Sequence, residues 1–532
     1  MQHRSSHPLR FLLIIFFISI FTTGCGRRAD SDIAADINRV LKEAGENRGE
    51  IEKVLDRYTE PGDSLKLEAA RYLVANMAGH SYVTYYLHDS SKVEVTFDVL
   101  DYPDYNTLLA GFEKLENERG TLDFDRLEIF EDMENIEAEL LIGHIEAAFD
   151  VWRGKPWARW LSFENFCEYV LPYRGSNEPL EAWRETFRER YAYIDTLMAD
   201  STDPIEAVRL INEDIRSWFK FDPRYYYHPT DQGLAEMFEN KMGRCEDMTN
   251  LTIYALRANG IAVTSDYTPY WADAGNNHAW NAIVTPDGRA LPFMGAEADP
   301  GQYNLANKIA KAYRKTFAQQ PDNLIFQERK QEEVPPWLAG KSYLDVTADY
   351  THVADINVTL DKDVPDSVDI AYVCVFNSGE WKAIDWARLE THEGKTVAHF
   401  KNIGTNVMYL PALYLNKEIV PYASPFVLYG QDSHCRFKAD TSRTISLQLT
   451  STRKIKKDSS SDTSGKTHLK SREEYELFYW DDDWRSLGKA VASDKPLTYD
   501  NIPAAGLYWL TTPSTEDDDR IFTTEYAQPV WW

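Results

Sequence analysis

Two residues of this sequence, a cysteine and a histidine, are well placed for covalent chemistry. Cys245 lies in Gly243-Arg244-Cys245-Glu246-Asp247, and His278 follows 33 positions later in Asn277-His278-Ala279-Trp280-Asn281. A thiolate attacks carbonyl carbons, and a neighbouring imidazole can accept the thiol proton while a third group orients the ring. The pair therefore indicates nucleophilic acyl transfer, on the condition that folding brings the two side chains together. Without that condition, the two are an ordinary buried cysteine and a strand histidine.

Cys245 is predicted to lie at or next to the start of a helix. One helical face is marked by Met248, Leu251, Thr252, Ala255 and Leu256, and Asn259-Gly260 provides a C-terminal stop. Free backbone N–H groups and the macrodipole at a helix N-terminus favour a thiolate. Glu246 and Asp247 oppose that effect, so the sequence leaves open how far the pKa of the thiol falls.

His278 is predicted to begin a β-hairpin, with a strand over 278–285, a two-residue turn at Asp287-Gly288 and a return strand over 289–293. With that turn, the residue numbers of two facing positions add up to 575, so Glu297 is expected to lie opposite His278. Side chains that face each other across strands have Cβ atoms about 4.5–5.5 Å apart. Glu297 is therefore the predicted orienting acid, unless Gly295 introduces a bulge that shifts the register. Asp299 and Asn281 are weaker candidates.

Substrate contacts are predicted at a few further positions. Trp280 shares a strand face with His278 and is expected to form a wall of the pocket. Asn281 is a weak candidate for a substrate contact. Gln232 is a weak candidate for donating a hydrogen bond to an oxyanion, and the backbone N–H of Cys245 is better placed to do so.

Length and composition narrow the classes of function. The 532 residues predict three or four domains, and a net charge of −28 argues against nucleic acid as a partner. No Cys/His spacing suggests a metal site, and no cofactor is expected. Cys374 and Cys435 lie in one predicted β region and could form a disulfide. Cys167, in an apolar stretch, is expected to be a buried small hydrophobe.

The N-terminus is predicted to be a targeting segment. Arg4 and Arg10 precede an apolar run from Phe11 to Phe21, and Thr22-Thr23-Gly24-Cys25 follows. Small residues leading into a cysteine resemble the bacterial lipobox, which implies cleavage before Cys25 and lipidation of its thiol. We expect an exported protein anchored by lipid to the bacterial cell envelope, at the outer membrane, with an ordinary signal peptide as the alternative.

The rest of the chain predicts an α+β multidomain protein. After the signal peptide (1–25), we expect a helical N-terminal domain (26–202), an α+β domain carrying Cys245 (203–344), a β-sandwich module (345–452), a polar linker or loop (453–471) and a second, smaller β module (472–532). The segments after Phe376 and Tyr479 resemble each other, with Trp381 and Trp484 at corresponding places. This similarity indicates two related β modules.

With Gly243-Arg244-Cys245-Glu246-Asp247, Gly260-Ile261-Ala262 and His278-Ala279-Trp280-Asn281, the middle of the chain resembles the transglutaminase-like superfamily, over about 130 residues. The resemblance implies a papain-like core in which Cys245 is the nucleophile and His278 the base. One departure stands out, because Met294 occupies the position at which the family usually has an orienting Asp. The layout also resembles Bacteroidetes-type exported lipoproteins.

The resemblance implies a cysteine-type enzyme acting on amide bonds of a protein, peptide or glycopeptide. Peptidase- or amidase-type hydrolysis is favoured over amine transfer, because water is the default acceptor unless the site excludes it. The alternative is a non-catalytic surface lipoprotein with a vestigial dyad, binding glycans or peptides through aromatic residues such as Trp480, Trp484 and Trp531-Trp532.

Overall fold

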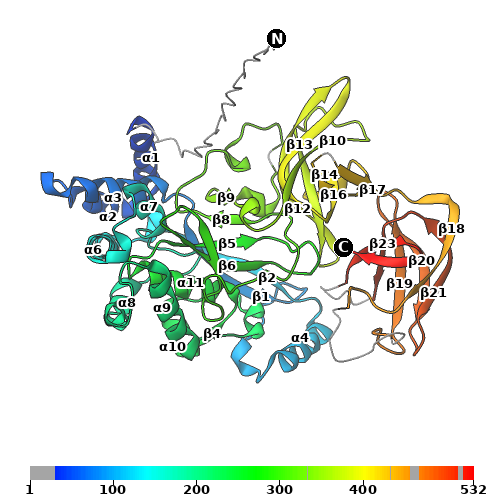
Figure 1. Ribbon diagram of the computed structural model, residues 1–532, viewed down its shortest axis with the longest axis horizontal. Coiled ribbons are helices and arrows are strands. Elements are labelled where there is room, and N and C mark those ends of the chain that lie inside the picture. The colour runs from blue at the N-terminus through cyan, green and yellow to red at the C-terminus, as the bar shows by residue number, and fades with distance from the viewer. Residues whose placement is uncertain (1–29, 332, 432, 456–466, 513–518) are drawn as a thin grey trace, which may run out of the picture.

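The structure is a computed structural model and describes residues 30–331, 333–431, 433–455, 467–512 and 519–532. In Figure 1 most of the N-terminal helices, blue to cyan, lie to the left of a central green sheet, and the β strands of the C-terminal region, yellow to red, lie to its right. The predicted α+β multidomain architecture is confirmed. Cys25 and most of the predicted linker lie outside the described residues. None of the helices in the described ranges combines the length and apolar character that a membrane crossing requires.

The N-terminal region is mainly helical. Its helices are α1 (Asp30–Glu43), α2 (Arg48–Asp56), α3 (Ser64–Asn76), α4 (Tyr105–Arg119), α5 (Asp132–Asn135), α6 (Ala138–Gly154), α7 (Phe163–Tyr169) and α8 (Trp183–Arg190). The region also contains an antiparallel pair, β1 (Ser81–His88) and β2 (Asp123–Glu131), that the prediction of a helical domain missed. The run Tyr82-Val83-Thr84-Tyr85-Tyr86, rich in aromatic and β-branched residues, is the signal that favours this strand.

The central region contains α9 (Pro204–Trp218), α10 (Leu234–Asn240) and α11 (Cys245–Arg257) and a five-stranded antiparallel sheet. The strand order is β7 (Ala290–Phe293), β6 (His278–Val284), β5 (Val263–Thr268), β8 (Tyr313–Lys315) and β9 (Tyr343–Asp345). A short parallel pair, β3 (Lys220–Phe221) and β4 (Met242–Gly243), lies beside it.

Helix α11 is the centre of a hydrophobic core shared by the N-terminal and central regions. Its apolar residues are buried on every side, because the sheet packs on one face and α8 and α9 pack on others. Tyr254 of α11 stacks on Trp183 of α8, with ring centroids 5.0 Å apart. One cluster joins Ile37 of α1 to Ile283 of β6. The predicted boundary at residue 202 therefore does not separate two cores.

The first β module is an eight-stranded antiparallel sheet whose two ends approach each other, since β10 contacts β16. Its strands are β10 (Val353–Thr359), β11 (Ile370–Asn377), β12 (Glu380–His392), β13 (Lys395–Gly404), β14 (Val407–Leu415), β15 (Glu418–Pro421), β16 (Phe426–Gly430) and β17 (Ser433–Arg436). Cys374 is buried and Cys435 exposed, and both are free, so the predicted disulfide is wrong. Cys167 is buried, as predicted.

The second β module packs two sheets around its own core. One sheet pairs β18 (Asp440–Leu449) with β21 (Leu497–Ala504), and the other has the order β20 (Trp484–Val491), β19 (Glu474–Trp480), β22 (Tyr508–Thr511), β23 (Ile521–Glu525) and β24 (Gln528–Trp531). Because β18 belongs here, the module begins before the predicted boundary at 452.

The two β modules meet through aromatic side chains. Trp381 packs edge-on against Trp480 at 5.7 Å, and Phe376 packs against Trp484 at 5.8 Å. Trp480 and Trp532 are buried in this shared cluster, and Trp484 packs against it. The tryptophans that were candidates for binding glycans or peptides therefore serve mainly to pack the two modules together.

Candidate active site

Cys245 is the first residue of α11, and Asp247 fixes the chain that precedes it. The carboxylate of Asp247 accepts hydrogen bonds from the backbone N–H of Arg244 (2.8 Å) and of Gln232 (2.9 Å). These bonds hold the preceding loop across the start of the helix. The first N–H groups of a helix have no intrahelical acceptor, so the N–H of Cys245 is in a position to stabilise an oxyanion.

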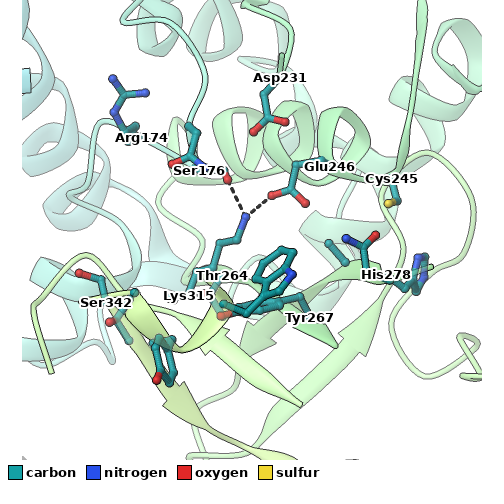
Figure 2. Close-up of a pocket in the computed structure, with 18 of the residues that line it drawn as sticks. Arg174, Ser176, Asp231, Cys245, Glu246, Thr264, Tyr267, His278, Lys315 and Ser342 are labelled. Atoms are coloured by element: carbon teal, nitrogen blue, oxygen red, sulfur yellow. Dashed lines mark hydrogen bonds and ion pairs between the residues drawn. The ribbon is translucent and has the colours of Figure 1, made fainter. Parts of the chain in front are cut away.

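Cys245 and His278 line the same cavity, which has a volume of about 590 Å³. In Figure 2 the sulfur of Cys245 is directed toward the end of β6 that carries His278. Helix α11 packs directly on β6, so the two elements bring the residues together from positions 33 apart. Cys245 is largely buried, with 6% of its surface exposed.

Hydroxyl, amide and charged groups make up much of the rest of the cavity. Lys315 of β8 extends between Glu246, with which it forms an ion pair, and Ser176, whose hydroxyl accepts a hydrogen bond at 2.6 Å (Figure 2). The neutral polar residues of the lining are Ser176, Asn177, Thr264, Thr268, Asn276, Asn277, Thr316 and Ser342. Trp337, Tyr267 and Tyr343 add aromatic surface. Such a lining can bind both water and a polar chain.

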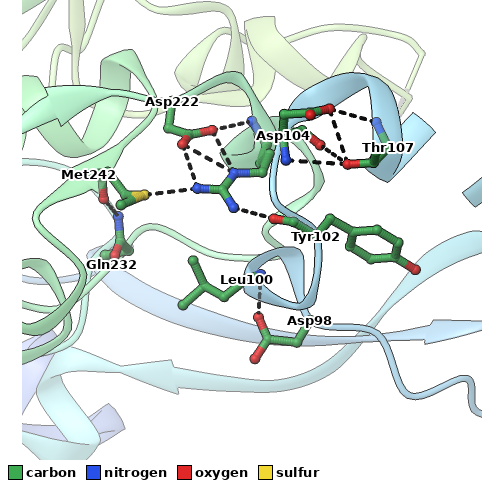
Figure 3. Close-up of polar contacts among 9 residues, drawn as sticks. Asp98, Leu100, Tyr102, Asp104, Thr107, Asp222, Gln232 and Met242 are labelled. Carbon is green, nitrogen blue, oxygen red and sulfur yellow. Dashed lines mark hydrogen bonds and ion pairs between the residues drawn. The ribbon is translucent and has the colours of Figure 1, made fainter. Parts of the chain in front are cut away.

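Tyr226 lines the cavity from the short 3₁₀ helix of Pro223–Tyr227, which Arg224 holds in place. The guanidinium of Arg224 pairs with Asp222 at 2.7 Å, donates to the carbonyl of Tyr102 and contacts the sulfur of Met242 at 3.2 Å (Figure 3). These contacts connect the N-terminal region to the loop that leads into Cys245.

The imidazole of His278 is held by a tyrosine and a tryptophan. Its Nε2 lies 2.5 Å from the hydroxyl oxygen of Tyr303, and its ring stacks on Trp271 with centroids 5.7 Å apart. Tyr303 is the site residue that sequence reasoning missed. It follows the hairpin in an irregular segment, 25 positions after His278, where no periodicity predicts a contact.

Glu297 does not face His278, and the predicted register is wrong by one. The residue numbers of paired positions, such as Asn281 and Phe293, add up to 574 and not to the predicted 575. The reason is that the turn has three residues, Pro286 to Gly288. The β7 strand ends at Phe293, and the chain turns between Met294 and Ala298. Among the described residues, no hydrogen bond joins the exposed Glu297 side chain to the His278 ring.

The other two candidates for the third group have structural contacts. Asp299 pairs with Arg216 of α9 at 2.6 Å and accepts a hydrogen bond from Asn212 at 2.9 Å. Asn281 is fully buried, donates to the carbonyl of Thr249 and accepts from the N–H of Gly295. Asn281 therefore ties α11 to the turn after β7, and it is absent from the cavity lining.

Gln232 and Trp280 are also outside the cavity lining. The Nε2 group of the buried Gln232 donates to the carbonyl of Met242 at 2.9 Å, so this amide stabilises the loop before α11. Trp280 is fully buried and packs edge-on against Tyr350 at 5.0 Å. Its ring supports the sheet beneath His278 instead of forming a wall of the pocket.

Burial controls the ionisation of the pair. It raises the pKa of Cys245 to about 11, and the nearby charge of Glu246 adds to this effect, while a hydrogen bond from the N–H of Ala279 and the charge of Arg244 oppose it. Burial alone lowers the pKa of His278 to about 4. The tendency of the helix terminus to favour a thiolate is thus outweighed. At neutral pH, the thiol and the imidazole are both uncharged.

Comparisons with known proteins identify part of this region. Residues 191–293 match the family model described as the transglutaminase-like superfamily. The crystal structure of red sea bream transglutaminase is similar at 9% identity and a TM-score of 0.19, covering 86% of this chain and 78% of that one. No curated protein matches the sequence. Residues 191–293, which include both Cys245 and His278, are a transglutaminase-like domain.

Proposed function

We propose that this protein is a thiol enzyme that hydrolyses amide bonds of a peptide, protein or glycopeptide, with Cys245 as nucleophile and His278 as base. The observation that carries the proposal is that both side chains line one polar cavity, at the adjoining ends of α11 and β6, inside a transglutaminase-like domain.

The proposed reaction starts from the neutral pair. As the sulfur attacks the carbonyl carbon, the thiol proton passes to the imidazole, and the oxyanion accepts a hydrogen bond from the N–H of Cys245. The C–N bond breaks as the imidazolium returns the proton to the leaving amine. Water, deprotonated by His278, then attacks the thioester, which releases the acid and regenerates the thiol.

Tyr303 takes the place of the orienting acid in this proposal. Because Nε2 of His278 contacts Tyr303, only Nδ1 is free for the thiol proton. The ring acts as a base in the tautomer in which Nε2–H donates to the tyrosine oxygen. A phenol fixes this tautomer without the charge that a carboxylate would contribute. Burial of Tyr303 raises the pKa of its hydroxyl, and the nearby charge of Glu297 adds to this effect, so Glu297 acts on His278 only through Tyr303.

Hydrolysis is favoured over transfer to an amine by the hydroxyl and amide groups around the thiol, which can hold water. We also propose that the chain is exported and anchored to the cell envelope through a lipid on Cys25, with no contact with nucleic acid. Metabolic labelling with an alkyne fatty acid tests the anchor, because Cys25→Ala should abolish the label.

The enzymatic proposal is tested with the full chain and a library of fluorogenic peptide amides, with and without a fluorescent primary amine. Cys245→Ser and His278→Ala should each abolish release of the reporter, while Cys167→Ser should retain it because the buried Cys167 is not part of the cavity lining. Incorporation of the amine in preference to hydrolysis would contradict the hydrolase assignment. Turnover that survives Cys245→Ser would contradict the mechanism.

A further inference from the structure

The loop before His278 is held by side chains from both β modules. Residues 271–277 form most of the connection from β5 to β6, and we call this segment the histidine loop. It carries Trp271, which stacks on the His278 ring, and Asn276 and Asn277, which line the cavity. Its position therefore decides where the imidazole lies relative to Cys245.

Asn377 of β11 binds the histidine loop at three places. Its amide nitrogen lies 3.0 Å from the carbonyl oxygens of Trp271 and Ala274, and 2.9 Å from that of Asn276. The neighbouring Ser378 hydroxyl accepts the N–H of Asn276 at 3.3 Å. Asn377 and Ser378 lie at the tip of the β11–β12 hairpin, so the end of this hairpin binds the histidine loop.

Arg520, just before β23 of the second module, binds the same loop. Its guanidinium donates to the carbonyls of Ala274 (3.0 Å) and Ala272 (2.8 Å), and also to those of Phe376 (2.6 Å) and Trp532 (3.1 Å). Arg520 is only 2% exposed, and each of these acceptors is a backbone oxygen. Burying a cation in this way is costly, and burial lowers its pKa to about 10.

Apolar packing makes the same connection. Ala272 of the histidine loop is part of the core of the first β module, whereas Trp271, next to it, is part of the core around α11. Backbone contact is also close, because a side chain at Gly404 would meet the carbonyl oxygen of Ile309. The segment around Ile309 pairs in turn with Trp271.

We propose that Asn377 and Arg520 are positioning residues that set the geometry of His278 through the histidine loop, so that the two β modules are parts of the active site and not independent binding modules. This inference rests on the proposed thiol chemistry. Catalytic geometry is sensitive to such supports, because a misplacement of about 1 Å can cost about 100-fold in rate.

The test uses the isosteric variant Asn377→Asp, which replaces the donor by an acceptor, and Arg520→Met. We expect kcat to fall about 10- to 100-fold with a much smaller change in KM. The pH at which the rate falls on the acid side should increase, because the pKa of His278 rises as the ring becomes less buried. Amide exchange of residues 271–277 should accelerate. Arg520→Lys should recover part of the loss. Should Asn377→Asp fail to fold, Arg520→Lys and Ser378→Ala provide the milder test.

Arg436→Met is the matched control. It removes an arginine that binds Asp361 and the carbonyl of Thr359 in the first β module, away from the histidine loop, and it should leave kcat and the exchange of the loop unchanged. Unchanged kcat, pH profile and loop exchange in Asn377→Asp would overturn the inference. If the wild-type chain cleaves no amide, the rate of Cys245 alkylation against pH and the exchange of the loop still decide it.

Discussion

Cys245 and His278 are both uncharged in the resting site, in contrast to thiol enzymes whose resting state is a thiolate–imidazolium ion pair. Burial holds the pKa of the thiol at about 11 and that of the imidazole at about 4. The neutral pair therefore persists from about pH 4 to about pH 11, and the thiol becomes reactive only when substrate lies close enough for the proton to move to the ring.

This ionisation predicts a distinctive pH dependence. Alkylation of Cys245 by iodoacetamide should rise steadily from neutral pH to about pH 11 and show no plateau at low pH, because the free thiolate is scarce. The limit of kcat/KM on the acid side should lie near pH 4, where His278 becomes protonated. The rate of Cys245 alkylation is measured by mass spectrometry on the Cys435→Ser chain, which lacks the exposed thiol. A plateau of labelling near pH 5 would indicate a preformed ion pair.

The same shifts also affect stability. His278 binds fewer protons in the folded state than in the unfolded state between pH 4 and about 6.5, so its contribution to stability is complete above pH 6.5 and decreases as the pH falls through this window. Cys245 binds more protons when folded between about pH 9 and 11, so its contribution is lost as the pH rises through that range.

Tyr303→Phe should lower kcat about tenfold or more, because the ring of His278 loses the partner that selects its tautomer. KM should change little, since Tyr303 is absent from the cavity lining. Steady-state kinetics across pH measure both effects. Tyr191→Phe is the control, because it also removes a buried hydroxyl, one that binds Asp214 at 2.8 Å, but lies away from the cavity. Wild-type kcat in Tyr303→Phe would exclude the positioning role.

At the scale of the elements, α11 was predictable and the hairpin after it was predictable except for its register. The apolar spacing and the stop at Gly260 placed the helix, which ends at Arg257. The register failed because the turn includes Pro286 as well as Asp287-Gly288. A Thr285 hydroxyl bond to Asp287 and the positive φ of Gly288 close this three-residue loop. The longer loop, together with the turn between Met294 and Ala298 that ends the hairpin, keeps Glu297 from facing His278.

The residues around His278 that could not be predicted come from segments distant in the sequence. Tyr303, Asn377 and Arg520 reach the site from irregular segments or hairpin ends, and no spacing in the chain relates them to His278. Helix and strand periodicity predicts which face of an element is buried, but it does not predict which other element will cover it.

Gly295 is the point at which the turn after β7 meets α11. A β-carbon at this position would lie 1.9 Å from the hydroxyl oxygen of Thr252 and 2.9 Å from the amide oxygen of Asn281. Gly295→Ala should therefore destabilise the fold by about 1–3 kcal/mol or more, measured by urea unfolding. Gly143→Ala in α6 is the control, because its β-carbon meets nothing within 4 Å, and alanine is the better helix former. Equal stability of the two variants would contradict the close contact.

At the scale of the whole molecule, the described regions share hydrophobic cores and are not independent domains joined by linkers. The N-terminal helices and the central sheet have one core around α11, and aromatic rings join the two β modules. Loss of any one region would expose apolar surface on another, so we expect the described regions to unfold together.

The junction of the central region with the first β module offers the clearest test of this unity. A β-carbon on Gly404 would lie 2.1 Å from the carbonyl oxygen of Ile309, and the N–H of Gly404 donates to the carbonyl of Ala310 at 2.9 Å. Both contacts join backbone to backbone, so Gly404→Ala can be accommodated only if the module shifts. We expect a loss of about 1–3 kcal/mol or more in the free energy of unfolding.

Because Ile309 pairs with Trp271, the shift caused by Gly404→Ala should also reach His278 and lower kcat. Calorimetry and steady-state kinetics on the same preparation measure the two effects. Gly430→Ala, in the same β module, adds a β-carbon that meets nothing within 4 Å and should behave as wild type. A Gly404→Ala chain that melts in a separate, earlier transition while keeping full activity would mean that the module is attached to the central region but does not support its chemistry.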